Sequence, residues 1–284
     1  MSVKIIVDSG SDILPEEAEQ MGVTVLPLKV SFGEDEYLDG KNLSHYEFYE
    51  KLIESDSLPK TSQISPFDYE QAFEQAFSEG YDEIICLTID SALSGCYQSA
   101  NIARDDNDKI YIVDTLNVAI AERIMVELAL RLRDENLSGA EIASKLNQSQ
   151  PRLKVLAMLD TLEYLKKGGR ISSATAFAGE LLSIKPVVTV DSAGTVVVCG
   201  KARGSKNGNN VLVNLINKFG GIDFNYPYAA AYSGLSDALV NKYLEDSKHL
   251  YAHHTDTIPL HSIGCAIGTH LGPGAVGVAF FTKE

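Results

Sequence analysis

The sequence is 284 residues long and acidic, with 24 Lys and Arg against 39 Asp and Glu and a formal net charge of −15. Such a chain repels polyanions, so the charge argues against nucleic-acid binding. With 45% hydrophobic residues the composition is that of a globular protein. The apolar runs fall short of the ~20 residues of a membrane helix, and the N-terminus turns polar too soon for a signal peptide. We therefore expect a cytoplasmic protein without stable membrane insertion.

The first half alternates β-rich runs with helical patterns, which is typical of a layered α/β sheet. Pro15, followed by two glutamates, favours a helix start, and Ser138 with Glu141 forms a capping box. Strands are expected at 3–7, 23–30, 83–89 and 109–113. Helices are expected to begin at Pro15, Ser44, Phe67, near Leu93, near Asn117 and at Ser138.

The second half has a different pattern, with a hairpin expected around the turn 191–194. Strands are expected at 153–159, 184–190, 195–198, 228–232 and 275–281, and helices at 161–167, 210–219 and 236–247. A polar stretch with Pro151 predicts a domain boundary. We expect two layered α/β domains, 1–150 with a largely parallel sheet and 151–284 with a mixed sheet, and a ligand between them.

The four cysteines are too dispersed for a disulfide framework or a structural zinc site. Cys86 and Cys265 stand in apolar runs and are expected in the core, whereas Cys96 is expected nearer the surface. No metal ligand set and no cofactor motif stands out. Residues 272–277 match GxGxxG, but too few residues follow for a dinucleotide-binding unit.

Two polar turns are candidates for a ligand site, because ligands collect at the carboxyl ends of strands in open α/β sheets. One contains Thr61 and Ser62, and the other contains Ser94 and Gly95 before a helix. Hydroxyls and free amides at a helix start can receive an anion or a carboxylate. The alternative is ordinary helix capping, for which Ser and Thr are preferred.

His270 lies among glycines in the stretch 268–274, where it could donate to a carboxylate or act as an acid or base. The alternative is a histidine that is merely hydrogen-bonded. Basic residues gather in the segment 163–206, which carries a local balance of +4 against −19 for the remainder. This segment is either a set of helix caps or a docking surface for an anionic partner.

Taken together, the chain resembles the DegV family of bacterial fatty-acid-binding proteins, the acyl-carrier subunits of fatty acid kinase. The resemblance rests on motifs in family order along nearly the whole chain: VDSGSD at 7–12, KTSQ at 60–63, SALSG at 91–95, YQSA at 97–100, TLEYLKKGGRIS at 161–172, IKP at 184–186 and GTHLGPGAVG at 268–277. The chain departs from the family mainly at 117–122, where glycines are usual, and in a sparser basic segment at 201–206.

The resemblance implies a carrier that buries one long-chain fatty acid, such as palmitate, and has no turnover of its own. Its carboxylate would be held by Thr61, Ser62, Ser94 with Gly95, and His270. A separate ATP-dependent fatty acid kinase would phosphorylate the acid to an acyl phosphate for phospholipid synthesis, and the docking surface for that kinase would include Lys167, Arg170 and Arg203. The alternative is a hydrolase or acyltransferase with Ser94 as nucleophile and His270 as base, which needs an orienting group and an oxyanion hole.

Overall fold

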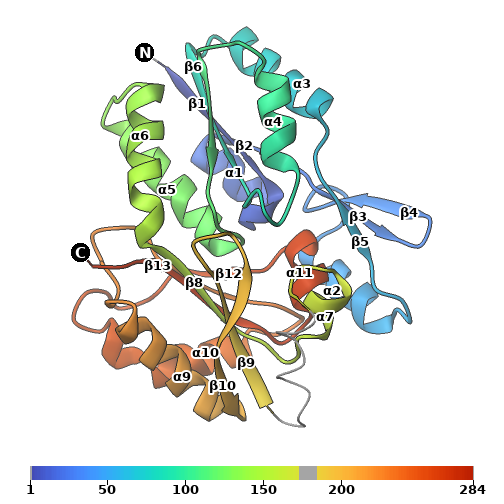
Figure 1. Ribbon diagram of the computed structural model, residues 1–284, viewed down its shortest axis with the longest axis vertical. Helices are drawn as coiled ribbons and strands as arrows, with labels where there is room; N and C mark the ends of the chain where they lie inside the picture. Colours follow the sequence, from blue (N-terminus) through green and yellow to red (C-terminus); the bar gives the residue numbers. More distant parts are fainter. Residues whose placement is uncertain (1, 173–183, 284) are drawn as a thin grey trace.

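The computed structural model describes residues 2–172 and 184–283, which form layers of helices and sheets (Figure 1). The described strands are β1 (Val3–Asp8), β2 (Val23–Leu26), β3 (Lys29–Phe32), β4 (Asp35–Leu38), β5 (Lys60–Ser62), β6 (Glu83–Thr88), β7 (Ile110–Asp114), β8 (Leu153–Met158), β9 (Ile184–Val190), β10 (Val196–Arg203), β11 (Ala229–Tyr232), β12 (Leu260–Ser262) and β13 (Val276–Phe281).

Seven of the ten described α-helices begin at, or directly after, a proline, serine or glycine. The ten helices are α1 (Pro15–Met21), α2 (His45–Glu54), α3 (Pro66–Ser78), α4 (Cys96–Arg104), α5 (Ile120–Asp134), α6 (Gly139–Ser149), α7 (Glu163–Lys167), α9 (Ser205–Lys218), α10 (Ala238–Asp246) and α11 (Cys265–Leu271). The capping box expected at Ser138 forms, since the Ser138 hydroxyl accepts from the Glu141 amide and the Glu141 carboxylate accepts from the Ser138 amide.

Two main sheets carry the architecture. The first has the strand order β2-β1-β6-β7, with every neighbouring pair parallel. The second has the order β10-β9-β8-β13-β11-β12, in which β11 and β12 are parallel and the other pairs are antiparallel. All strands of the second sheet come from residues beyond 152. The expected parallel sheet, followed by a mixed sheet, is confirmed; the division into domains 1–150 and 151–284 is a proposal that this order supports.

Helix α5 separates the two main sheets and packs against both of them (Figure 1). Its first seven residues are all buried, including Glu122 and Arg123. Helices α3 and α4 cover the far face of the parallel sheet, while α9 and α10 cover the far face of the mixed sheet. The hydrophobic core therefore runs from one sheet to the other through α5.

Two sequence expectations were wrong. Residues 23–30 are not one strand, because Pro27 interrupts the run and places β2 in the parallel sheet and β3 in a separate antiparallel sheet, β4-β3-β5. A helix that the sequence did not predict, α11, begins at Cys265 and includes His270. Cys96 is fully buried in the first turn of α4, as are Cys86 and Cys265 in their own elements.

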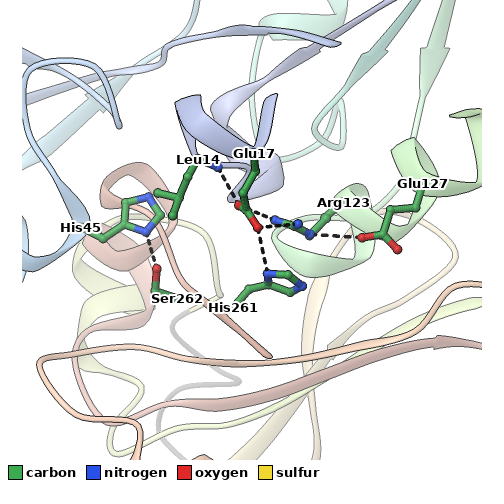
Figure 2. Close-up of polar contacts among 7 residues, drawn as sticks. All are labelled: Leu14, Glu17, His45, Arg123, Glu127, His261 and Ser262. Carbon is green, nitrogen blue, oxygen red and sulfur yellow. Dashed lines mark hydrogen bonds and ion pairs between the residues drawn. The ribbon is translucent and has the colours of Figure 1, made fainter. Parts of the chain in front are cut away.

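A continuous segment of the second half, residues 261–266, is bonded to the first half at every position, and we call this segment the clasp. His261 lies 3.6 Å from the Glu17 carboxylate, and the Ser262 hydroxyl lies 2.7 Å from the His45 ring (Figure 2). Arg123 binds the same Glu17 carboxylate through two hydrogen bonds and also pairs with Glu127.

The remaining clasp bonds fix the start of α11. The Tyr49 hydroxyl donates to the Ile263 carbonyl, and the Gly264 amide donates to the Asp12 carboxylate over 2.8 Å. The buried Asp39 carboxylate accepts from the amides of Cys265 and Ala266. These amides begin α11 and have no partner within the helix, so the carboxylates cap it from outside. Helix α11 is thus held by the first half of the chain.

Replacement of Asp39 tests the clasp. In Asp39→Ala two buried amides lose their acceptor, so we expect the free energy of unfolding to fall by roughly 2–4 kcal/mol, measured by urea denaturation. Asp35→Ala, an exposed acid on β4, is the control and is expected to change stability by less than about 0.5 kcal/mol. Equal stabilities for the two variants would show that the Asp39 cap does not hold α11.

Candidate functional site

A cavity of about 370 Å³ lies between the two main sheets and is lined by residues of both halves of the chain. Most of the lining is aliphatic, and a smaller part of it is polar. The lining residues that carry side-chain polarity are Thr61, Ser62, Gln63, Ser94, Arg170, Thr189 and His270. The Thr189 hydroxyl is already bonded to the Val155 carbonyl. The other six polar side chains stand on four elements or turns that the fold brings together: the end of β5, the turn before α4, the turn after α7, and α11.

Thr61 and His270 form a direct hydrogen bond across the site. Thr61 stands in the middle of β5, which pairs with β3, and His270 stands in the last turn of α11. The Thr61 hydroxyl oxygen and His270 Nε2 are 2.9 Å apart. The clasp positions α11, so the pairing of these two residues depends on the contact between the two halves. The sequence placed both residues in one site, and the structure brings them together.

The His270 ring is a neutral base in this setting. Burial lowers its pKa from 6.5 to about 4, and the Arg170 guanidinium contributes in the same direction. Gly168 lies against the ring, since a methyl group at residue 168 would come within 2.2 Å of Nδ1. Nδ1 is buried and has no hydrogen-bond partner among the described residues.

The bonding of the ring decides which nitrogen carries its proton. A buried N–H without an acceptor is rarer and costlier than a lone pair without a donor. We therefore assign the proton to Nε2, which then donates to the Thr61 hydroxyl oxygen. The hydroxyl proton of Thr61 is left to donate to a ligand in the cavity. His270 is consequently a residue that orients Thr61.

The turn with Ser94 and Gly95 lies at the start of α4. Gly95 lies directly against the Gln63 side chain, since a methyl group at residue 95 would come within 1.9 Å of the Gln63 side-chain oxygen. The Gln63 amide also donates to the Ser99 hydroxyl in the first turn of α4. Gln63 therefore ties the end of β5 to this turn. The motif KTSQ contained this residue, but spacing alone gave no sign of its contact with Gly95.

Arg170 lines the cavity, whereas sequence reasoning placed it on a docking surface. Its side chain is half-buried, and its guanidinium donates to the carbonyls of Gly168 and Leu93. The two other residues of the expected docking surface are exposed: Lys167 pairs with Glu163 on α7, and Arg203 ends β10. The positive charge of Arg170 thus faces the polar part of the cavity.

The hydrogen bonds of Ser94 and His270 do not link the two residues as a nucleophile and its base. The Ser94 hydroxyl contacts the Cys96 sulfur at 3.3 Å, and His270 Nε2 is engaged by Thr61. The described residues contain no group of three or more His, Cys, Asp or Glu side chains arranged to hold a metal ion. Among the same residues, no helix is both long and apolar enough to cross a membrane. The site therefore offers donors and one cation around an apolar volume.

Comparison with known proteins places the whole chain in one family. The family model described as "Uncharacterised protein, DegV family" matches residues 2–283. A DegV domain-containing protein of Deinococcus radiodurans is 35% identical over 285 residues, which cover 98% of this chain and 98% of the relative.

Two solved structures show the same fold over the full length. One, described as fatty acid binding of a DegV family protein from Thermus thermophilus, is 29% identical, covers 100% of both chains and has a TM-score of 0.88. The other, described as a fatty acid (stearic acid)-binding protein from Eubacterium ventriosum, is 26% identical, covers 99% of this chain and 98% of its own, and also has a TM-score of 0.88. With the family model and the curated relative matching almost end to end, the chain belongs to the DegV family.

Proposed function

We propose that this chain binds one long-chain fatty acid in the cavity between its two sheets. The observation that carries the proposal is a single cavity with an aliphatic lining and a cluster of hydrogen-bond donors beside a cation. Its volume of about 370 Å³ falls in the range of small-molecule sites. Two structurally similar relatives are described as fatty-acid-binding proteins.

The apolar part of the cavity supplies the affinity for an acyl tail. Its walls come from β8, β9, α5 and α11, with aliphatic residues such as Ile120, Ala157, Val188 and Ile267. Burial of a methylene is worth ~0.8 kcal/mol, so about ten methylenes contribute roughly 8 kcal/mol before the entropy cost of ordering the chain.

The polar part of the cavity suits the carboxylate. Thr61 offers the hydroxyl proton that His270 leaves available, and Ser62 and Ser94 offer two further hydroxyls. Arg170 supplies the positive charge that a partly desolvated carboxylate needs. The start of α4 at Gly95 adds the positive end of a helix dipole. In this arrangement His270 acts through Thr61 instead of binding the carboxylate itself.

The bound acid is presented to a separate ATP-dependent kinase in this proposal. Ser62 and Gln63 are exposed, so the polar end of the cavity reaches the protein surface. A carboxylate oxygen attacks the γ-phosphorus of ATP, ADP leaves, and an acyl phosphate forms for phospholipid synthesis. Lys167 and Arg203 provide exposed positive charge for the kinase, and Arg170 stands next to the reacting group. The chain is then a carrier without turnover of its own, acting in the cytoplasm where ATP is available.

Analysis of the bound lipid tests this function. We expect protein purified under native conditions and then denatured to release about one equivalent of unmodified long-chain fatty acid, detected by mass spectrometry. Thr61→Val is expected to retain much less fatty acid than the wild type, whereas Thr61→Ser, which keeps the hydroxyl, retains it. Absence of fatty acid from the wild type, together with ester hydrolysis that is lost in Ser94→Ala, would favour the hydrolase alternative.

Variants of Arg170 and Lys167 distinguish a role in ligand binding from a role in kinase docking. In Arg170→Ala the loss of the cation is expected to raise the His270 pKa above about 4, though only in part because burial is the larger cause of its lowered value, and to lower fatty-acid retention; NMR titration of the imidazole follows the pKa. Lys167→Ala is expected to leave both values unchanged and to lower only kinase-dependent phosphorylation. An unchanged His270 pKa in Arg170→Ala would remove Arg170 from the carboxylate site.

A further inference from the structure

The hairpin formed by β9 and β10 closes one wall of the cavity. Val190 and Val196, on either side of its turn, both line the cavity. The turn is internally rigid, because the Asp191 carboxylate accepts from the amides of Ala193 and Thr195, and the Asp191 carbonyl accepts from the Gly194 amide. The tip of this hairpin can therefore move as one unit.

The tip rests on two residues of the first half, Asp90 and Ala92. Gly194 is buried with φ +74°, and a methyl group at residue 194 would come within 2.4 Å and 2.7 Å of the two Asp90 carboxyl oxygens. It would also come within 2.8 Å of the Ala92 side chain. Only glycine allows this approach, both for its backbone conformation and for the space available.

Asp90 also builds the turn that carries Ser94. Its side-chain Oδ1 accepts from the Ala92 amide, and its carbonyl accepts from the amides of Leu93 and Ser94. Its Oδ2 is buried and has no hydrogen-bond partner among the described residues. One residue thus supports the hairpin tip on one side and the ligand-binding turn on the other.

Two carboxylates near Asp90 make a negative charge on Asp90 itself unfavourable. Asp114 ends β7 and accepts from the Ser91 amide, and Asp191 lies in the hairpin turn itself. The cation Arg170 reaches the turn through the Leu93 carbonyl. Burial, together with Asp114 and Asp191, raises the pKa of Asp90 from 3.8 to about 6.

We propose that Asp90 is a positioning residue of the carboxylate site and that the hairpin tip seats on it as an acid-tightened latch over the cavity. When Asp90 carries a proton, the tip covers an uncharged carboxyl group and the Val190–Val196 wall closes. When Asp90 is ionised, the seated tip buries an unpaired charge beside two other carboxylates, and the wall opens more often. The latch deepens the proposed function, because it controls access of the acyl tail.

The pH window follows from the two states of the hairpin. With the tip seated the pKa of Asp90 is about 6. With the tip lifted, Asp90 loses the cover of the hairpin and the nearby Asp191 carboxylate, so its pKa falls towards the ordinary value of 3.8, while Asp114 stays beside it. The free energy that favours the seated tip is therefore greatest below about pH 4, decreases as the pH rises to 6, and is constant above that. A full return to 3.8 sets the upper limit, about a hundredfold change in the opening equilibrium.

The opening can be measured on ligand-free protein with a thiol in the wall. Val196→Cys places a buried thiol behind the hairpin, and Cys199→Ser removes the one half-buried native thiol. The labelling rate by 4,4′-dithiodipyridine is divided by the rate for the same variant in denaturant at each pH. We expect this relative rate to rise by up to roughly 25-fold between pH 4.5 and pH 7, because the rest of the change takes place below pH 4.5.

Three variants in this background identify the cause. Asp90→Asn keeps the shape of the carboxyl group without its charge, so labelling is expected to be slow at both pH values. Gly194→Ala cannot seat the tip and is expected to be labelled fast at both. Asp106→Asn, an exposed acid outside the latch, is the control and keeps the wild-type response. A pH response that persists in Asp90→Asn, or its absence from the parent, would overturn the latch. Because no lipid is present, failure here leaves the proposed fatty-acid binding untouched.

Discussion

The carboxylate caps on α11 are the constraint on which the rest of the site depends. Along the chain α11 lies between β12 and β13 of the mixed sheet, yet its first amides are bonded to Asp12 and Asp39 of the first half. These bonds to the first half place His270 beside Thr61 on β5. Without the clasp, α11 would not be held against the first half, His270 would not lie beside Thr61, and the polar end of the cavity would not form.

The same arrangement explains why the candidate site combines apolar walls with a cation and a neutral histidine. Helix α5 separates the two sheets, and its first residue Ile120 lines the cavity together with Val118 and Ala119 just before it. Arg170, which follows α7, lines the polar part of the cavity. Burial and Arg170 keep His270 neutral, so the ring serves to orient the Thr61 hydroxyl. In the proposed function the carboxylate is bound by these fixed donors, and the hydrogen bonds of Ser94 and His270 go to Cys96 and Thr61 instead of joining the two residues.

Much of the fold was readable from the sequence, because local patterns determine it. The helix at Pro15, the capping box at Ser138 and the parallel strands all follow from residues close in sequence. The errors arose where tertiary contacts decide. Helix α11 includes Gly268, a residue of low intrinsic helix propensity, and its first amides are capped by carboxylates more than 200 residues away in the sequence. The sequence also did not show that Arg170 lines the cavity, a position that depends on the packing of α7 against α11. The residues Thr61, Ser94 and His270 were found through family motifs, whereas the contacts of Gln63 and Asp90 needed the three-dimensional structure.

A crystal structure of the protein with palmitate tests the central claim most directly. The account predicts a carboxylate oxygen within hydrogen-bond distance of the Thr61 hydroxyl, with the bond between Thr61 and His270 Nε2 retained and the tail between the two sheets. The account would be contradicted by a carboxylate at the opposite, aliphatic end of the cavity, or by a ligand bound outside the cavity with the clasp and the Thr61–His270 bond unchanged.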